Sequence, residues 1–151
     1  MNIRGITKND FDYVVSVLDR WWGGPSVERA HPVFYYELGA QALIAETDEE
    51  DLVGFLLGFI ATGEHLTGYV HLVGIHPDYR RQGVGKKLYQ EFMTRCEAIG
   101  AQRMKAIAAP GNDGSVRFHE ALGFQTAHDG HYAGRDRGRV VFTKDLRAKR
   151  S

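Results

Sequence analysis

A junction between a predicted strand and a predicted helix carries the residues of this sequence that are best suited to chemistry. Residues 76–86 read His-Pro-Asp-Tyr-Arg-Arg-Gln-Gly-Val-Gly-Lys. Gly83 and Gly85 place no side chain where the helix would begin, so backbone N–H groups and the positive end of the helix dipole can face an anion. Positive side chains flank them at Arg80, Arg81 and Lys86. The segment therefore predicts a binding site for a phosphate or pyrophosphate group.

Three other interpretations of this junction exist. A pair of glycines also occurs where a chain only makes a tight turn from strand to helix, and that interpretation stays open. The spacing differs from the Gly-x-Gly-x-x-Gly of dinucleotide-binding folds. It differs from a P-loop as well, because Leu88 and not Ser or Thr follows Lys87. Neither of these nucleotide-binding motifs is predicted.

The pattern of apolar residues predicts the elements around the junction. Apolar residues recur every third or fourth position from Val84 to Ile99, and Gly100 follows, which is typical of an amphipathic helix and its end. An acidic turn at residues 47–51 joins two apolar runs and indicates an antiparallel hairpin. Strands are expected at residues 3–6, 42–46, 52–61, 67–75, 103–109, from 124 onward and at 140–143. Helices are expected before residue 23 and at residues 27–38, 84–99 and 115–122. This alternation indicates an α/β or α+β fold around one mixed sheet.

Length and charge limit the classes of protein that fit. The chain has 151 residues, 43% of them hydrophobic, and no repeat or linker, so a single domain is expected over residues 1–151, with residues 146–151 as a frayed tail. Nineteen Lys and Arg balance nineteen Asp and Glu, so neither nucleic acid nor a membrane surface is an expected partner. A nucleic-acid binder that uses residues 135–139 and the basic tail is the weaker alternative.

Three further observations exclude other classes. The longest apolar run, residues 52–61, is far shorter than the ~20 residues of a membrane helix. The single cysteine, Cys96, rules out an internal disulfide framework and favours a reducing, cytoplasmic setting. No metal is expected, because metal-ligand spacing is missing among the scattered histidines His31, His65, His76, His128 and His131.

Beyond these features, the sequence resembles the GNAT superfamily of acetyl-CoA-dependent N-acetyltransferases. The family signature is Arg/Gln-x-x-Gly-x-Gly/Ala after a strand that ends in Val/Ile-x-Pro, and residues 80–85 and 75–77 match it. The family's downstream Asn-x-x-Ala, Tyr and Leu-Gly-Phe correspond to Asn112, Ser115, His119 and residues 122–124. Ser115 and His119 depart from that pattern. The resemblance implies a GNAT fold, a mixed sheet of about six or seven strands with about four helices and with strands splayed at the cofactor cleft.

The resemblance also implies acetyl-CoA as co-substrate. Amides of the loop at residues 81–86 would hold the pyrophosphate, and the strand end at residues 73–75 would pair with the pantetheine arm. Asn112 would contact the cofactor near its thiol, although its other interpretation is a loop residue that caps the next helix. The implied cofactor-binding residues are Val73, Ile75, Arg80, Arg81, Gln82, Gly83, Val84, Gly85, Lys86, Asn112 and Ser115.

Two histidines are the catalytic candidates that the resemblance implies. His119 stands where many members have a tyrosine that protonates the departing thiolate, and imidazole can serve as such an acid near neutral pH. His71 stands roughly where some members place a glutamate that accepts the amine proton through water. Strand alternation predicts that His71, Val73 and Ile75 share one face. The alternatives are a partly exposed, non-catalytic His119 and a core His71.

The resemblance assigns acceptor choice to the first two helices and the last hairpin. Trp21, Trp22 and Tyr132 are the expected substrate contacts, whereas Phe34 and Tyr36 are expected to pack the helices on the sheet. The acceptor itself stays open among small amines, amino-acid-like metabolites, antibiotics and peptide amines. The oligomeric state, a homodimer included, stays open too.

The implied reaction is direct attack of a neutral amine on the thioester, with a backbone N–H near Ile75 stabilising the oxyanion. Cys96 lies on the same predicted helix face as Phe92 and Ile99, so no acyl-cysteine intermediate is expected. The rival function is a non-catalytic acyl-CoA-binding or regulatory module that has lost its acid, as the change at His119 permits. Release of free CoA in the presence of amines separates the two.

Overall fold

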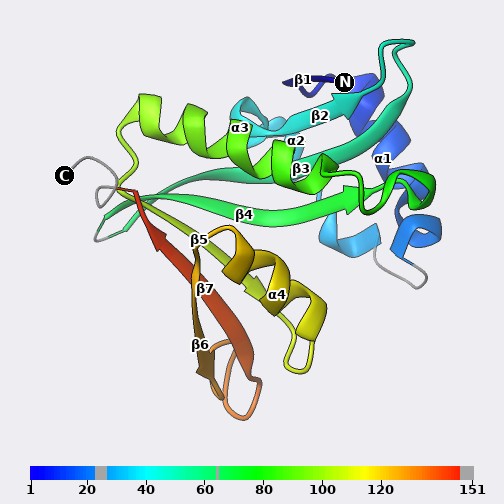
Figure 1. Cartoon of the computed structure of the whole chain (residues 1–151). Coiled ribbons are helices and arrows are strands. Elements are labelled where there is room, and N and C mark those ends of the chain that lie inside the picture. Colours follow the sequence, from blue (N-terminus) through cyan, green and yellow to red (C-terminus); the bar gives the residue numbers. More distant parts are fainter. Residues whose placement is uncertain (23–26, 64, 147–151) are drawn as a thin grey trace.

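A computed structural model of the chain describes residues 1–22, 27–63 and 65–146, and it forms one mixed sheet of seven strands in the order β1-β2-β3-β4-β5-β7-β6 (Figure 1). Only β4 and β5 run parallel to each other. The strands are β1 (Asn2–Gly5), β2 (Leu43–Glu46), β3 (Leu52–Thr62), β4 (Leu66–Ile75), β5 (Arg103–Ala108), β6 (Gln125–Asp129) and β7 (Arg139–Asp145). The helices are α1 (Lys8–Trp22), α2 (Val33–Tyr36), α3 (Val84–Ile99) and α4 (Asp113–Ala121), with 3₁₀ turns η1 (Val27–Arg29), η2 (Gly39–Gln41) and η3 (Pro77–Tyr79). The predicted fold class is confirmed.

Helices cover both faces of the sheet, with α3 on one face of β2–β4 and α1 and α2 on the other (Figure 1). Leu43 and Ile44 are adjacent in β2 and point to opposite faces, as the two-residue period of a strand requires. Leu43 joins a core cluster under α3, and Ile44 joins a second cluster under α1. The helix α4 lies on the α3 face, where Phe118 packs against the first cluster. The two faces are called the α3 face and the α1 face below.

The predicted helix over residues 27–38 is wrong. The chain there forms η1, then the four-residue α2, then η2. Pro32 explains the break, because it has no N–H to continue a helix from the residues before it and lies at the N-cap of α2. The loop that faces the end of β4 is therefore built from short turns.

Strand β4 separates from β5 halfway along its length. Their parallel pairing begins at Thr67 and Arg103 and ends at Val70 and Ala106. Beyond that point β4 continues to Ile75 and pairs with β3 alone. The strands are thus splayed, as predicted, and the edge of β4 after Val70 is unpaired toward β5.

The C-terminal end of the described chain belongs to the core. Leu146 is buried, and its N–H donates to the carbonyl of Gln102 at 3.0 Å. The predicted frayed tail therefore does not include Leu146. The rest of that tail, residues 147–151, lies outside the described residues.

Candidate active site

The start of α3 presents backbone donors that no helical partner uses. The first intrahelical bond runs from the N–H of Lys87 to the carbonyl of Gly83, at 3.0 Å, so the amides of Val84, Gly85 and Lys86 precede the ladder. Gly83 has a left-handed φ of 78° and no side chain caps the helix there. Because Arg81 also has a positive φ, of 63°, the whole turn is shaped to expose its amides.

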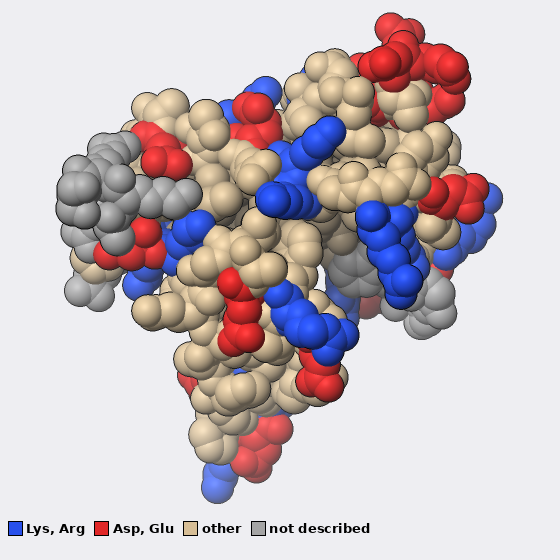
Figure 2. All heavy atoms as spheres, viewed as in Figure 1, with Lys and Arg blue, Asp and Glu red and all other residues tan. Residues whose placement is uncertain are grey.

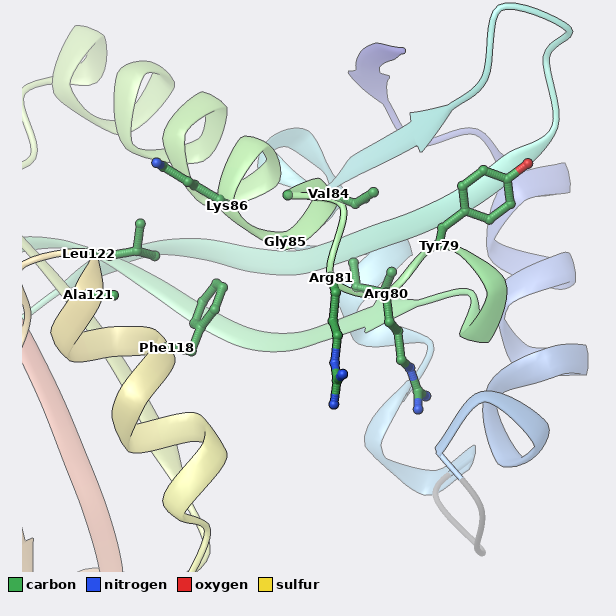
Figure 3. A pocket seen from close by; sticks show the side chains of 11 residues that line it. Tyr79, Arg80, Arg81, Val84, Gly85, Lys86, Phe118, Ala121 and Leu122 are labelled. Atoms are coloured by element: carbon green, nitrogen blue, oxygen red, sulfur yellow. The ribbon is translucent and has the colours of Figure 1, made fainter.

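A cavity of about 500 Å³ lies in front of these amides (Figure 3). Arg80 and Arg81 extend side by side from the turn, and Phe118 points across from α4 toward the start of α3. A Cβ atom built at Gly85 would lie 3.5 Å from the Phe118 ring, so a larger residue there would close the space between the two helices. Figure 2 shows Lys and Arg side chains around this opening. The predicted phosphate site is therefore an open, positively charged hollow.

Not every residue predicted for this hollow can contribute its side chain. Val84 is 1% exposed and packs in the core, so only its amide can take part. The Gln82 side chain turns back and donates to the carbonyl of Asp78 at 3.2 Å. The Arg80 guanidinium donates to the carbonyl of Trp21 and so attaches the turn to the end of α1. Arg81 and Lys86 remain exposed beside the hollow.

A second cavity, of about 510 Å³, continues the first through the gap between β4 and β5 and is called the slot below. The two cavities share Ile75, Gly85 and Phe118. From the α3 face the slot is lined by Asn112, Ser115 and His119, and at its other end by Arg29 and His71. The slot thus passes from one face of the sheet toward the other.

The free edge of β4 supplies polar backbone groups to the slot. The N–H of His76 donates to the carbonyl of Val53 on β3 at 2.8 Å. Because backbone groups alternate in direction along a strand, the N–H and C=O groups of Ile75 and Val73 face away from β3. Both residues line the slot. They can pair with an extended, amide-bearing ligand.

His119 is held in a buried network at the α4 side of the slot. Its Nδ1 lies 2.8 Å from the carbonyl of Ser115, so we assign the ring proton to Nδ1. Its Nε2 then accepts from the hydroxyl of Tyr89 at 2.7 Å. The imidazole also stacks on Phe142, with 4.0 Å between ring centroids. Both nitrogens of His119 are therefore engaged, and the predicted partly exposed position is wrong, because the side chain is only 5% exposed.

Burial also sets the charge of this pair. It lowers the pKa of His119, an effect that the Ser115 hydrogen bond only partly opposes, and it raises the pKa of Tyr89 well above its ordinary value. Both groups are therefore neutral near pH 7. Sequence reasoning missed Tyr89, although its position four residues after Gly85 places it on the same helix face as the phosphate-facing turn.

His71 does not share a face with Val73 and Ile75, and that prediction is wrong. The pairing of β3 with β4 shifts between Leu57 and Gly58, which leaves His71 as the extra residue of a β-bulge. Val73 and Ile75 pack toward the α3 face, whereas the His71 ring stacks on Phe34, with 3.9 Å between centroids. A bulge reverses the alternation that a regular strand would keep.

The geometry of His71 leaves one ring nitrogen unused. Nε2 lies 2.8 Å from the carbonyl of Arg29, which accepts only if Nε2 carries the proton. Nδ1 then carries the lone pair and has no partner among the described residues. Burial lowers the pKa of His71, so its imidazole is neutral near pH 7.

The predicted acceptor contacts have different outcomes. Trp21 is 5% exposed and packs on Phe55 in the core, and its contact with substrate stays a prediction. The side chain of Trp22 lies outside the described residues. Tyr132 is exposed in the turn after β6, with the Nζ atom of Lys105 4.8 Å from its ring centroid. Asn112 caps α4, since its Oδ1 accepts from the N–H of Ser115 at 3.1 Å, and it also lines the slot.

The described residues offer neither a thiol nucleophile nor a metal site. Cys96 is buried, and burial raises the pKa of its thiol to about 12, so it is no nucleophile. No group of three or more His, Cys, Asp or Glu side chains in the described ranges could hold a metal ion. Within the same ranges, no helix has the length and apolar character to cross a bilayer.

Comparison with known proteins adds independent findings. The model of the acetyltransferase (GNAT) family matches residues 11–124. An acetyltransferase of Pectobacterium atrosepticum is 24% identical over 131 residues, which cover 83% of this chain and 89% of that protein. The ribosomal-protein-S18-alanine N-acetyltransferase of Escherichia coli has a similar structure, with a TM-score of 0.75 and 18% identity over 96% of this chain and 93% of that one. The phosphinothricin acetyltransferase of Sinorhizobium meliloti, solved in complex with AcCoA, also has a TM-score of 0.75, with 19% identity over 96% of this chain and 88% of that one.

Proposed function

This chain belongs to the acetyltransferase (GNAT) family, and we propose that it is an N-acetyltransferase that moves an acetyl group from acetyl-CoA to a primary amine. The observation that carries the proposal is the pair of adjoining cavities, with Ile75, Gly85 and Phe118 in common, that lie between the uncapped start of α3 and His71. One end suits a diphosphate, and the other end offers a neutral base. Amine and thioester would meet between them, in a ternary complex.

The residues present fit coenzyme A. The amides of Val84, Gly85 and Lys86 would hold its diphosphate, with Arg81 and Lys86 supplying charge. The unpaired edge of β4 at Val73 and Ile75 would bind its amide-bearing arm, because buried backbone groups otherwise lack partners. Bound acetyl-CoA supplies the thioester carbonyl that is attacked. Direct contact of Asn112 and Ser115 with this arm is a further expectation.

His71 is the group that we assign as general base. Its Nε2–H is fixed on the carbonyl of Arg29, so the Nδ1 lone pair is the one available to take a proton from the amine, directly or through water. The N–H of Ile75, on the free edge, is the proposed donor to the developing oxyanion. No step of this route needs a covalent bond to the protein.

The pair of Tyr89 and His119 is assigned to the departing thiolate. His119 has no proton to give to the slot, because its Nδ1–H is bonded to Ser115 and its Nε2 accepts from Tyr89. Within the pair, the hydrogen that can turn toward the slot is that of the Tyr89 hydroxyl. Since the pKa of Tyr89 lies far above that of a thiol, the hydroxyl would not protonate the thiolate. Its hydrogen would turn from Nε2 of His119 to the sulfur and stabilise the thiolate by a hydrogen bond, and solvent would protonate the sulfur. His119 is thus a positioning residue.

The rival function is a binding module of the same fold that does not turn over. Calorimetry with acetyl-CoA and a thiol-release assay with a panel of small amines, amino acids and peptides separate the two. The N-acetyltransferase releases CoA only when an acceptor is present. Binding of acetyl-CoA without thiol release across the whole panel would favour the module. We place the reaction in the cytoplasm, where a buried free thiol such as Cys96 stays reduced.

A further inference from the structure

The α1 face beside the slot carries a group of hydrogen-bond donors without a matching acid. Met104 and Ala106 of β5 pack under α3, so the alternate residues Lys105 and Ile107 project from the opposite face. His71 also lies on that face, stacked on Phe34. The proposed base and the Lys105 ammonium therefore share one surface.

The ammonium of Lys105 lies over a residue of the turn before β7. Ala108, at the end of β5, pairs with Val140 at the start of β7, so the turn before β7 lies where β4 and β5 splay apart. Tyr132 belongs to that turn, and the Nζ atom of Lys105 lies 4.8 Å from its ring centroid. Lys105 forms no ion pair within the described ranges.

Two phenols accompany this ammonium. Tyr69 pairs with Lys105 across the two strands. Burial, and then the nearby Tyr132, raise the pKa of Tyr69, so its hydroxyl stays a donor. Phe59 packs 5.2 Å from the Tyr69 ring and makes the floor apolar. An ammonium with two phenolic hydroxyls over an apolar floor is a set that suits a carboxylate.

Two carboxylates of the last hairpin align with arginines. Asp145 of β7 aligns with Arg103, which stands two residues before Lys105 on β5 and so further from the splayed end. At the end of the hairpin, Asp129 aligns with Arg139. These carboxylates each face an arginine in register, and Lys105 does not share them.

We propose that the acceptor amine carries a carboxylate close to its nitrogen, and that Lys105, Tyr69 and Tyr132 bind this carboxylate while the amine lies at His71. The proposal rests on the N-acetyltransferase function above. Tyr69 precedes His71 by two residues, which is about 7 Å along a strand, so the two groups of the acceptor would be separated by a few bonds. A free amino acid has this chemistry, and so does a peptide that begins with an acidic residue.

Matched acceptors test the carboxylate directly. Thiol release is measured with phenylalanine against phenylalaninamide, and with two peptide amides that begin with glutamate or with glutamine. The acidic member of at least one pair should have a kcat/KM about 10- to 100-fold higher, the range for a hydrogen bond to a charged group. The pair that responds identifies the source, free amino acid or peptide. Equal values within both pairs would overturn the proposal.

Variants of Lys105 tie the preference to this site. Lys105→Met should reduce the ratio within the responding pair to about 1, whereas Lys105→Arg should keep most of it. Lys8→Met, on α1 far along the chain and paired with Asp12, is the matched control and should keep the full ratio. A ratio that survives Lys105→Met would overturn the proposal. Thiol release with no acceptor at all would be a different failure, that of the N-acetyltransferase function itself.

Discussion

The hollow at the start of α3 and the α1 end of the slot are built in different ways. In the hollow, the groups proposed to face a diphosphate are backbone amides from one short segment, residues 81–86. At the α1 end of the slot stands His71 of β4, and the proposed carboxylate contacts Lys105 and Tyr132 are side chains of β5 and of the turn after β6. A backbone site can be specified by local conformation, whereas a side-chain site needs the whole sheet in register. The first kind should tolerate change elsewhere in the chain better than the second.

The largest effect is expected at the α1 end, from His71→Gln. Glutamine can still donate to the carbonyl of Arg29 but has no basic nitrogen, so kcat should fall about 100-fold. Burial lowers the pKa of His71 from 6.5, so the neutral base persists below pH 6.5, and kcat of the unaltered protein should fall only as the pH drops through that lowered pKa. The variant should lack this dependence. The measurement is kcat by thiol release from pH 5 to 8.

A histidine outside the slot provides the control. His128 lies exposed on β6, and His128→Gln should leave both the rate and its pH dependence unchanged. If His71→Gln kept more than half of the original kcat, His71 would be a packing residue stacked on Phe34, and the base would have to be sought elsewhere.

The next largest effect is expected at the α3 end, from Gly85→Val. A Cβ atom added at this position would lie 3.5 Å from the Phe118 ring, so the branched side chain would crowd the space where the two cavities adjoin. Affinity for acetyl-CoA should fall on the order of 30-fold by calorimetry, about 2 kcal/mol. Gly5→Val, in β1 with open space around it, is the control and should bind normally. Unchanged affinity in Gly85→Val would mean that the cofactor does not pass this point.

Of the three substitutions, Tyr89→Phe should have the smallest effect on activity. We expect kcat to fall about 10-fold with unchanged affinity for acetyl-CoA, because the proposed role of the hydroxyl in the reaction is to stabilise the departing thiolate. Stability should also fall, by about 1–3 kcal/mol in urea unfolding, since Nε2 of His119 is left buried without a donor. Tyr36→Phe, at an exposed position, should change neither quantity. Lower stability with normal kcat would assign the pair to structure alone.

Local signals in the sequence predicted most of the fold and the hollow at the start of α3. The helix α3 was predicted with its bounds, because its apolar period lies within the helix itself and Gly100 is its C-cap. The turn at Gly83 and Gly85 was predicted for the same reason. The strands were each found within two residues of their expected bounds.

The rest depends on partners that lie far away in the chain. The bulge at His71 arises from the shift in pairing at Gly58 on another strand, and no residue near His71 in the sequence indicates it. Trp21 was predicted as a substrate contact from its place beside paired glycines, but it packs on Phe55, which is thirty-four positions later. The proposed role of Tyr89 depends on its hydrogen bond to His119, which lies thirty positions later in the chain. Contacts of this range cannot be inferred from spacing along one segment.

Titration of the isotope-labelled protein with acetyl-CoA, followed through its backbone amide resonances, tests most directly whether the start of α3 and the free edge of β4 form one cofactor site. The largest shifts should fall on the amides of Val84, Gly85 and Lys86 and, along the edge of β4, on Val73 and Ile75. Shifts confined to another surface, such as the hollow of Phe11, Val15 and Pro32 beside α1, would contradict the proposed site. So would the absence of any shift at saturating acetyl-CoA.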